Sequence, residues 1–245
     1  MNDSYIAVLD SGIGGLSVLK ELVKSLPEYN YIYLGDNANA PYGNKTVREL
    51  KELTAKNIDV LLKFNVKVIV VACNTLSINL LPFIAEYSGL KVFGIFPPVE
   101  RYMVKGEKVL LLSTVLTAKK FSPSQNLHVL GLKSLVRDLE YNMFNAREIN
   151  LNFNLSNSVG YYINKKFYYD RIILGCTHYE FIKNEIYDHF CPRKISSGIN
   201  FTVNNVKNFI THNKSLVNHN KNKVLFVGES AKANEGFWVF GGQKQ

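Results

Sequence analysis

The chain has 245 residues, of which 47% are hydrophobic and 12% aromatic, enough to bury a sizeable core in one large or two small domains. Its formal net charge is +9 and its pI is near 9.3, which favours anionic partners such as acidic small molecules, nucleic acid or membrane surfaces. This composition excludes a largely disordered chain, and no apolar run approaches the roughly 20 residues of a membrane-spanning helix.

The first part of the chain alternates short apolar runs with helical patterns. Thr46 and Glu49 form the pattern of a capping box at the start of the second helix. Asn, Pro and Gly mark residues 37–46 as a loop. The predicted strands cover residues 5–10, 29–36, 66–73 and 91–96, and the predicted helices cover residues 16–26, 46–65 and 74–89.

The alternation then restarts. Strands separated by helices predict parallel βαβ units with right-handed crossovers. We interpret the Lys/Asn-rich segment 207–223 as a solvated loop and helix face. The predicted strands cover residues 107–114, 126–132, 169–176 and 223–230, and the predicted helices cover residues 133–144, 156–167 and 177–190, with a short helix at the end.

The two parts of the chain match at one offset. Cys176 follows Cys73 by 103 residues, and the same offset places Thr114 over Ser11 and Thr117 over Gly14, which suggests an internal duplication. We therefore predict an α/β fold of two pseudo-symmetric lobes, each a parallel-sheet sandwich, with the site in the cleft between them. Ligands bind at the carboxyl ends of parallel strands. The residues expected at such ends are Asp10, Ser11, Asp36, Cys73, Thr114 and Cys176.

The N-terminus has no basic segment followed by a long apolar stretch, so we expect no secretory signal and a cytoplasmic location. The three cysteines, Cys73, Cys176 and Cys191, fit reduced thiols. None lies in a CxxC pair or near histidines at metal-ligand spacing, so we expect no metal site. Cys191, in "HFCPRK", does not end an apolar run before a helix start, as the other two cysteines do, and is interpreted as structural.

Cys73 and Cys176 each end an apolar run and precede polar residues that open a helix. A helix N-terminus stabilises a thiolate, so we expect a lowered thiol pKa there. His178, two residues after Cys176, is suited to orient that thiol or exchange protons with it. The alternative is two buried structural cysteines. Two matched thiols suit removal of a proton from one face of a carbon and its return on the other, whereas a nucleophilic hydrolase needs one cysteine with a base.

The glycine-rich turn "DSGIGG" (10–15) permits an anionic group to approach backbone N–H groups, although it matches no phosphate-binding motif. Asp10 is placed to receive or orient a proton or to bind an ammonium group. The alternative is a helix N-cap role for Asp10 or Ser11. The loop "GDNANAPYG" with Asp36 and Tyr42 is either part of the site or an ordinary turn.

Four motifs occur together in this chain: "DSGIGGLSV" (10–18), "YLGDNANAPYGNKT" (33–46), "ACNT" (72–75) and "GCTHY" (175–179). "STVLT" (113–117) and "ISSGI" (195–199) match more loosely. In this order and spacing the chain resembles the glutamate racemases of the aspartate/glutamate racemase superfamily, over essentially its whole length.

The resemblance implies a cofactor-independent racemase that interconverts L- and D-glutamate and supplies D-glutamate for peptidoglycan synthesis. It implies that Cys73 acts on the D-enantiomer with help from Asp10, and that Cys176 acts on the L-enantiomer with help from Glu140 and His178. The residues implied to hold the substrate's carboxylates and ammonium are Asp10, Ser11, Tyr42, Gly43, Asn74, Thr75, Thr114, Thr117, Thr177 and His178.

The resemblance also implies a homodimer and a C-terminal segment that returns to the first lobe. The expected division is residues 1–95 plus 207–245 for the lobe with Cys73, and residues 96–206 for the lobe with Cys176. Departures from the family pattern are Asn39 for Arg, Pro97 for an acidic residue, Leu132-Lys133 for Cys-Pro and Ser196 for Asp, and none of them is a proton-transfer residue.

Two alternatives stay open at this point. The substrate is aspartate or another acidic compound in the first, although "DSGIGG" and "PYG" favour glutamate. In the second, the basic surface binds nucleic acid or protein, since some members of the family are implicated in inhibiting DNA gyrase. The chain has no basic helix interleaved with aromatics and no nucleic-acid fold motif, which argues against such binding as the main role.

Overall fold

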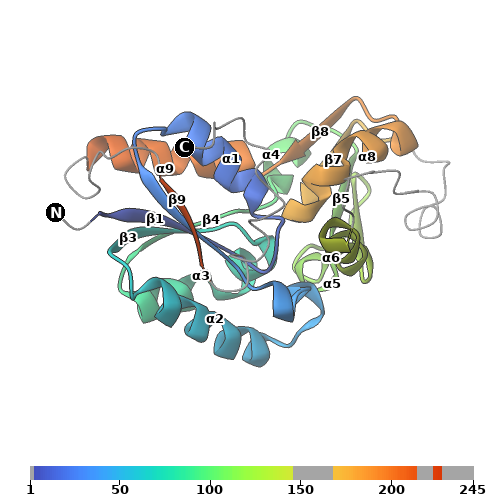
Figure 1. Cartoon of the computed structure of the whole chain (residues 1–245). Helices are drawn as coiled ribbons and strands as arrows, with labels where there is room; N and C mark the ends of the chain where they lie inside the picture. Colours follow the sequence, from blue (N-terminus) through green and yellow to red (C-terminus); the bar gives the residue numbers. More distant parts are fainter. Residues whose placement is uncertain (1–2, 146–167, 214–222, 228–245) are drawn as a thin grey trace.

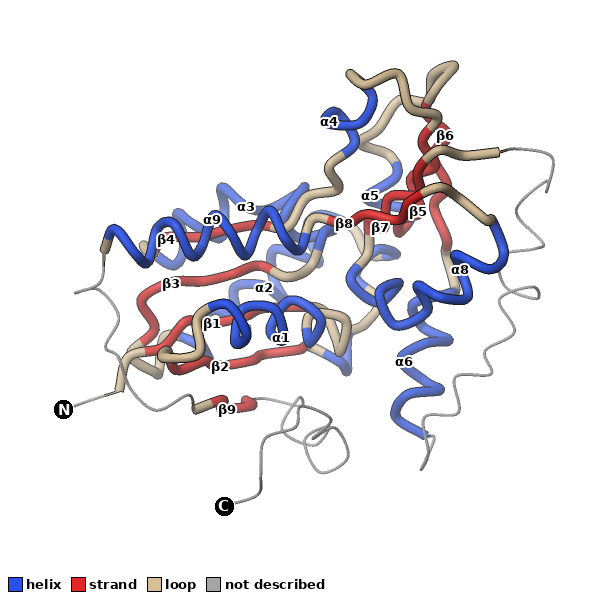
Figure 2. The backbone as a smooth tube through the Cα atoms, turned by 90° about the horizontal axis from the view of Figure 1, so that it is seen from above, coloured by secondary structure: helices blue, strands red, loops and turns tan. Residues whose placement is uncertain are grey.

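The computed structural model describes residues 3–145, 168–213 and 223–227. Within these ranges the strands form two parallel sheets that stand side by side, each with helices on its faces (Figures 1 and 2). This arrangement confirms the predicted α/β class with two sheet-based lobes.

The first sheet has the strand order β4-β3-β1-β2-β9, with all described pairs parallel. Its strands are β1 (Tyr5–Asp10), β2 (Asn30–Gly35), β3 (Val66–Val71), β4 (Lys91–Gly94) and β9 (Val224–Val227). Every residue of β1 is buried, as expected for a central parallel strand that is covered on both faces.

Helices cover the first sheet on both faces (Figure 1). The helices α1 (Leu16–Ser25) and α9 (Ile199–His212) pack on one face, where Leu19 and Val203 share a core with Val8. The helices α2 (Val47–Leu61) and α3 (Asn74–Ser88) pack on the other, where Ile58 and Leu80 share a core with the alternate residues of β1. The period of two along β1 therefore divides its side chains between two cores.

The second sheet has the strand order β6-β5-β7-β8, also parallel throughout. Its strands are β5 (Val109–Thr114), β6 (Leu127–Leu132), β7 (Arg171–Gly175) and β8 (Lys194–Ser197). The helices of this part are α4 (Val99–Met103), α5 (Val115–Ala118), α6 (Leu135–Asn145) and α8 (Lys183–Phe190).

The order β8-β7-β5-β6 repeats the order β4-β3-β1-β2 of the first sheet. The internal duplication predicted from the offset of 103 residues is therefore visible in the topology, with β1 and β5 in corresponding places and β3 and β7 likewise. Cys73 follows β3 and Cys176 follows β7, so each sheet carries one cysteine at an equivalent strand end.

Several elements differ from the sequence prediction. The strand β8 and the helices α4 and α9 were not predicted, and the segment after Cys176 begins as the 3-10 helix η3 (Thr177–Ile182) before α8 starts. The loop after β2 contains two short 3-10 turns, η1 (Asn37–Asn39) and η2 (Tyr42–Asn44). The predicted helix 156–167, strand residues 228–230 and the terminal helix lie outside the described residues.

The C-terminal part returns to the first sheet. Helix α9 contributes Ile199, Val203, Val206 and Ile210 to the core of that sheet, and β9 pairs with β2. The predicted boundary between residues 206 and 207 falls inside α9, and the division of the chain into lobes stays a prediction. Among the described helices, none is long and apolar enough to cross a membrane.

The capping box at the start of α2 gives the first testable prediction. The Thr46 hydroxyl accepts from the Glu49 N–H at 3.3 Å, and the Glu49 carboxylate accepts from the Thr46 N–H at 2.7 Å. Thr46→Ala removes the hydroxyl that accepts from the Glu49 N–H and keeps the backbone N–H of residue 46, so we expect the free energy of unfolding to fall by about 1 kcal/mol in urea denaturation. Thr211→Ala, near the end of α9, serves as the control and is expected to change it by less than about 0.5 kcal/mol. Equal effects of the two substitutions would contradict this account.

Candidate active site

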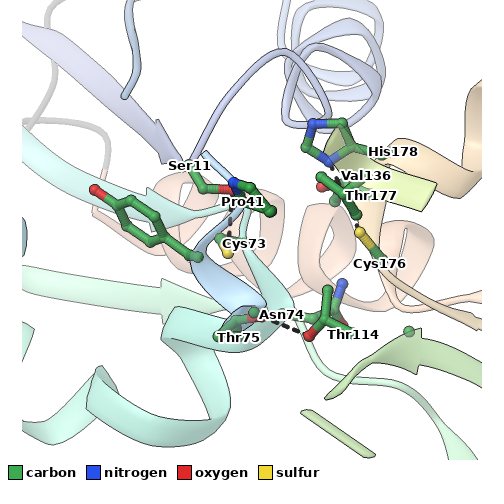
Figure 3. A pocket seen from close by; sticks show the side chains of 13 residues that line it. Ser11, Pro41, Cys73, Asn74, Thr75, Thr114, Val136, Cys176, Thr177 and His178 are labelled. Carbon is green, nitrogen blue, oxygen red and sulfur yellow. Dashed lines mark hydrogen bonds between the residues drawn. The ribbon is translucent and has the colours of Figure 1, made fainter. Parts of the chain in front are cut away.

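A small cavity lies between the carboxyl ends of the strands of the two sheets (Figure 3). Both thiols predicted to act, Cys73 and Cys176, line it from different sheets. The lining residues are Ser11, Pro41, Tyr42, Gly43, Cys73, Asn74, Thr75, Thr114, Val136, Gly175, Cys176, Thr177 and His178. The cavity thus brings together most of the residues implied by the resemblance, while Asp10, Thr117 and Glu140 stand directly behind its wall.

Cys73 caps the N-terminus of α3 and has 6% of its surface exposed. Its sulfur lies 3.8 Å from the Ser11 hydroxyl. Burial raises the pKa of the Cys73 thiol, the charges of Asp10 and Cys176 raise it further, and the Leu76 N–H at the helix start lowers it by less. The expectation of a lowered pKa at this helix start is therefore wrong for Cys73, because desolvation outweighs the helix N-terminus.

Cys176 has a different set of partners. Its sulfur lies 3.7 Å from Nδ1 of His178, and Nε2 of the same imidazole lies 2.5 Å from Oε1 of Glu140. Burial lowers the pKa of His178, but its hydrogen bonds to Cys176 and Glu140 and the negative charge of these partners together raise that pKa well above its ordinary value. The imidazolium form is thus favoured between a sulfur and a carboxylate.

Glu140 belongs to α6 of the second sheet, yet its carboxylate is held by the first. Oε1 accepts from the Ile13 N–H at 2.9 Å, and Oε2 accepts from the Asn37 side-chain amide at 3.0 Å. These two donors come from the loops that follow β1 and β2. The hydrogen bonds therefore tie the loops of one sheet to the acid–base pair of the other.

The glycines of "DSGIGG" permit this contact. A Cβ atom on Gly12 would stand 1.8 Å from Oε1 of Glu140, and one on Gly14 would stand 2.4 Å from Nδ1 of His178. The interpretation of the turn as a cradle for a ligand's anionic group needs correction, since the anion bound by the Ile13 N–H is the Glu140 carboxylate.

Asp10 is fully buried at the end of β1. Its Oδ2 accepts from the Gly15 N–H at 2.5 Å, directly before α1 begins, whereas its Oδ1 has no hydrogen-bond partner in the described part of the chain. Burial raises the pKa of Asp10 to about 6. Asp10 thus combines a cap-like contact with a free oxygen near Cys73, which keeps both predicted roles open.

Hydroxyl groups of the two sheets meet at the cavity wall. The Thr75 hydroxyl at the start of α3 lies 3.0 Å from that of Thr114 and 3.3 Å from that of Thr117, both of the second sheet. Asn74 lines the cavity with a buried Oδ1 that has no partner among the described residues. Such neutral donors and acceptors are suited to bind carboxylate and ammonium groups.

The loop after β2 is fastened by Asp36. Its carboxylate accepts from the side chains of Asn39 at 2.8 Å, Asn57 at 3.4 Å and Tyr42. The Tyr42 hydroxyl is thus engaged outside the cavity, while residues Tyr42 and Gly43 line it. Of the predicted strand-end residues, Asp10 and Asp36 do not line the cavity.

Sequence reasoning missed Pro41, Val136 and Gly175 in the lining, and Asn37 behind it. Pro41 and Gly175 lie inside recognised motifs, and Val136 precedes Glu140 by four residues on one helix face, a usable signal. Asn37 lies in the same motif as Pro41, but nothing in the sequence indicated its contact with Glu140. Among the described residues, no group of three or more His, Cys, Asp or Glu is arranged to hold a metal ion.

Comparison with known proteins agrees with this geometry. No protein-family model matches the chain. A curated glutamate racemase of Clostridium botulinum (strain Alaska E43 / Type E3) is 35% identical over 201 residues, covering 74% of each chain. A glutamate racemase of Clostridium novyi (strain NT) is 38% identical over 194 residues, covering 74% of this chain and 73% of that one.

Solved structures match over more of the chain. Glutamate racemase isoform RacE1 from Bacillus anthracis matches with a TM-score of 0.76 at 26% identity, covering 98% of this chain and 95% of that one. The glutamate racemase of Escherichia coli, solved in complex with L-glutamate and the activator UDP-MurNAc-Ala, matches with a TM-score of 0.76 at 25% identity, covering 96% of each chain.

These relatives show that the chain, with its two parallel sheets, is an α/β enzyme of the racemase class, an isomerase. Within this class, both curated relatives are glutamate racemases. The chain belongs to the glutamate racemase family.

The close approach at Gly14 gives a prediction. In Gly14→Ala the new methyl group meets His178 and Thr177, at 2.4 and 2.6 Å before relaxation, so the imidazole must move away from Cys176. We expect racemisation of glutamate to fall by about 100-fold, as for a displacement of about 1 Å in a positioned catalytic group. Ser17→Ala, which removes one hydrogen bond to the Gly14 carbonyl, is the control and should keep near-normal activity. Wild-type rates for Gly14→Ala would contradict the packing argument.

The buried Asp10 carboxyl gives a second prediction. Its pKa is about 6 in the folded protein against 3.8 ordinarily, so the folded state binds the proton more tightly, and stability is lost as pH rises through this window. Each tenfold difference in proton affinity is worth about 1.4 kcal/mol. Asp10→Asn removes the charge and should raise the free energy of unfolding by up to about 3 kcal/mol at pH 8, and about half as much at pH 5.

Urea unfolding at the two pH values checks the Asp10→Asn prediction, with racemisation measured alongside and expected to fall. The exposed Asp188→Asn, which removes a carboxylate from α8, is the matched control and should show no such pH dependence. A destabilised Asp10→Asn protein at pH 8 would refute the argument from burial.

Proposed function

We propose that this protein is a glutamate racemase that interconverts L- and D-glutamate with Cys73 and Cys176 as opposed acid–base groups. The observation that carries the proposal is the pair of buried thiols that line one cavity from two different sheets. The family membership of the chain supports glutamate as the substrate, and aspartate is the competing candidate that the test below includes.

The two sulfurs have different surroundings. Cys176 lies beside the His178 imidazole, which can exchange a proton with it, whereas burial raises the pKa of Cys73 and keeps the proton on that thiol. On L-glutamate, Cys176 removes the α-proton and Cys73 returns a proton to the opposite face. The reverse reaction starts from the Cys73 thiolate, with Asp10 as the nearby group that accepts its proton.

The α-proton of glutamate is a very weak acid, so the site must stabilise the carbanion through the substrate carboxylate. The polar cavity wall is suited to this role because buried, fixed donors act strongly where water is excluded. We assign substrate binding to Ser11, Tyr42, Gly43, Asn74, Thr75, Thr114, Thr117, Thr177 and His178, with Asp10 toward the ammonium group. The partnerless oxygens of Asp10 and Asn74 support direct contacts with the substrate.

Three finer statements belong to the same proposal. The product D-glutamate supplies peptidoglycan synthesis, the protein acts in the cytoplasm, and two copies form a homodimer. These statements rest on the resemblance to the family. Nucleic-acid or gyrase binding is not proposed as a main role.

The proposal predicts how each cysteine behaves on substitution. Cys73→Ala and Cys176→Ala should each lower racemisation in both directions by at least about 1,000-fold, because each thiol carries out one of the two proton transfers and both transfers are needed. The exposed Cys191→Ala is the matched control and should keep full activity. Circular dichroism of glutamate and aspartate solutions follows turnover, and unfolding curves check that the variants fold.

Solvent deuterium tests the chemistry directly. In D₂O the wild-type protein should place deuterium on the α-carbon of glutamate as it racemises, and should do so far more slowly with aspartate. Normal turnover by either cysteine variant, or racemisation without deuterium uptake, would contradict the two-thiol mechanism. Faster turnover of aspartate would contradict the substrate.

A further inference from the structure

Asn37 lies outside the set of residues assigned to the site, yet it touches the acid–base pair. It begins η1, directly after the strand-end residue Asp36, and its side-chain amide donates to Oε2 of Glu140 at 3.0 Å. The two residues are 103 positions apart in sequence and belong to different sheets. Among the described residues, this is the one side-chain hydrogen bond from the first sheet to the Glu140 carboxylate.

The contacts of Glu140 divide between its two oxygens. Oε1 is shared by the Ile13 N–H and Nε2 of His178, while Oε2 receives Asn37. Without Asn37 the carboxylate would be held through Oε1 alone, so its rotation about its last bond would be less restricted. The amide thus fixes the plane of the carboxylate that His178 faces.

Chemistry also fixes the orientation of the amide itself. Oε2 of Glu140 accepts from Nδ2 of Asn37, so the NH₂ group of Asn37 faces Glu140 and its oxygen faces away. That oxygen is buried and has no hydrogen-bond partner in the described ranges, so its orientation is set by Glu140 rather than by a contact of its own. The NH₂ group is therefore the part of the Asn37 amide that makes the contact with Glu140.

We propose that Asn37 is a positioning residue for the half-reaction at Cys176. It holds Glu140, and through Glu140 it holds the His178 imidazole, so that the acid–base pair of the second sheet is complete only when the loops of the first sheet are docked against it. The inference rests on the proposed racemase function and adds to it a residue that acts on one of the two proton transfers.

The equilibrium between the enantiomers constrains the rate constants that any variant can have. Free L- and D-glutamate have equal free energies, so any variant must keep equal values of kcat/KM in the two directions. A weaker Cys176 side raises the transition state of its proton transfer, which then limits the rate in both directions. The two directions still differ in their isotope effects. Only α-deuterated L-glutamate transfers its deuteron in the step at Cys176.

The experiment measures kcat, KM and substrate isotope effects with α-deuterated L- and D-glutamate for the full-length protein. For Asn37→Ala we expect kcat to fall about 10- to 100-fold in both directions, the size typical for loss of an outer partner of a functional group, with KM changed less than about twofold. The isotope effect should rise with L-glutamate, because Cys176 removes that deuteron, and fall with D-glutamate.

Two further variants complete the design. Asn37→Asp keeps the shape but replaces the donor by a second carboxylate beside Glu140, so its kcat should fall further than that of Asn37→Ala. Asn39→Ala removes an amide from the same turn that bonds to Asp36 instead, and should keep both isotope effects at wild-type values.

Each outcome decides the matter. Opposite changes in the two isotope effects, confined to the Asn37 variants, support the proposal. Unchanged rates, isotope effects that move together, or equal losses for Asn39→Ala would overturn it. If the wild-type protein fails to racemise glutamate, the proposed function itself is refuted and this inference falls with it, whereas a racemising wild type with a normal Asn37→Ala variant refutes the inference alone.

Discussion

The contact between the turn after β1 and the Glu140–His178 pair is the constraint on which the site depends. The carboxylate oxygen of Glu140 receives a backbone N–H from the first sheet and an imidazole nitrogen from the second, so it joins the two sheets at the cavity. Replacing Gly12 or Gly14 by any residue with a Cβ atom would force these groups apart. The position of both thiols on one cavity follows from how closely the sheets approach here.

Duplication places the thiols at equivalent strand ends, but it does not make them equivalent chemically. Cys73 is buried and lies near Asp10. Both its burial and the charge of Asp10 raise the pKa of the thiol, which favours the protonated form. Cys176 instead contacts an imidazole that is held by the Glu140 carboxylate. A two-base mechanism needs one acid and one base in each direction, so two half-sites with different proton-exchange partners suit the proposed reaction.

The sequence predicted most of the fold because its signals are local. The buried strands, the glycine turn and the capping box of α2 each depend on neighbouring residues, and the offset of 103 residues revealed the repeated strand order. The strand β8 was missed because its four residues, Lys194–Ser197, include two serines, and α9 because its asparagines resemble a loop composition.

The parts that the sequence could not reveal are those set by distant contacts. Ile13 and Glu140 are 127 residues apart, so no local pattern indicates that the glycine turn binds a side chain of the other sheet. The same holds for Asn37, whose donor role depends on docking of the sheets. The pKa of Cys73 was mispredicted for a related reason, because the extent of its burial depends on the closed cavity and not on the helix start that follows it.

The site also carries local costs that the rest of the fold must offset. Asp10 keeps a buried carboxyl with a pKa near 6, and in the described part of the chain its Oδ1 and the Oδ1 of Asn74 have no hydrogen-bond partner. Unsatisfied buried oxygens of this kind cost about 1–3 kcal/mol each, and the well-packed cores on both faces of the first sheet supply the stability that tolerates them. Such violations of folding rules gather at functional sites, because groups already satisfied by the protein have no bonding capacity left for a substrate. The Oδ1 atom of Asn74, which lines the cavity, is therefore suited to contact a bound substrate.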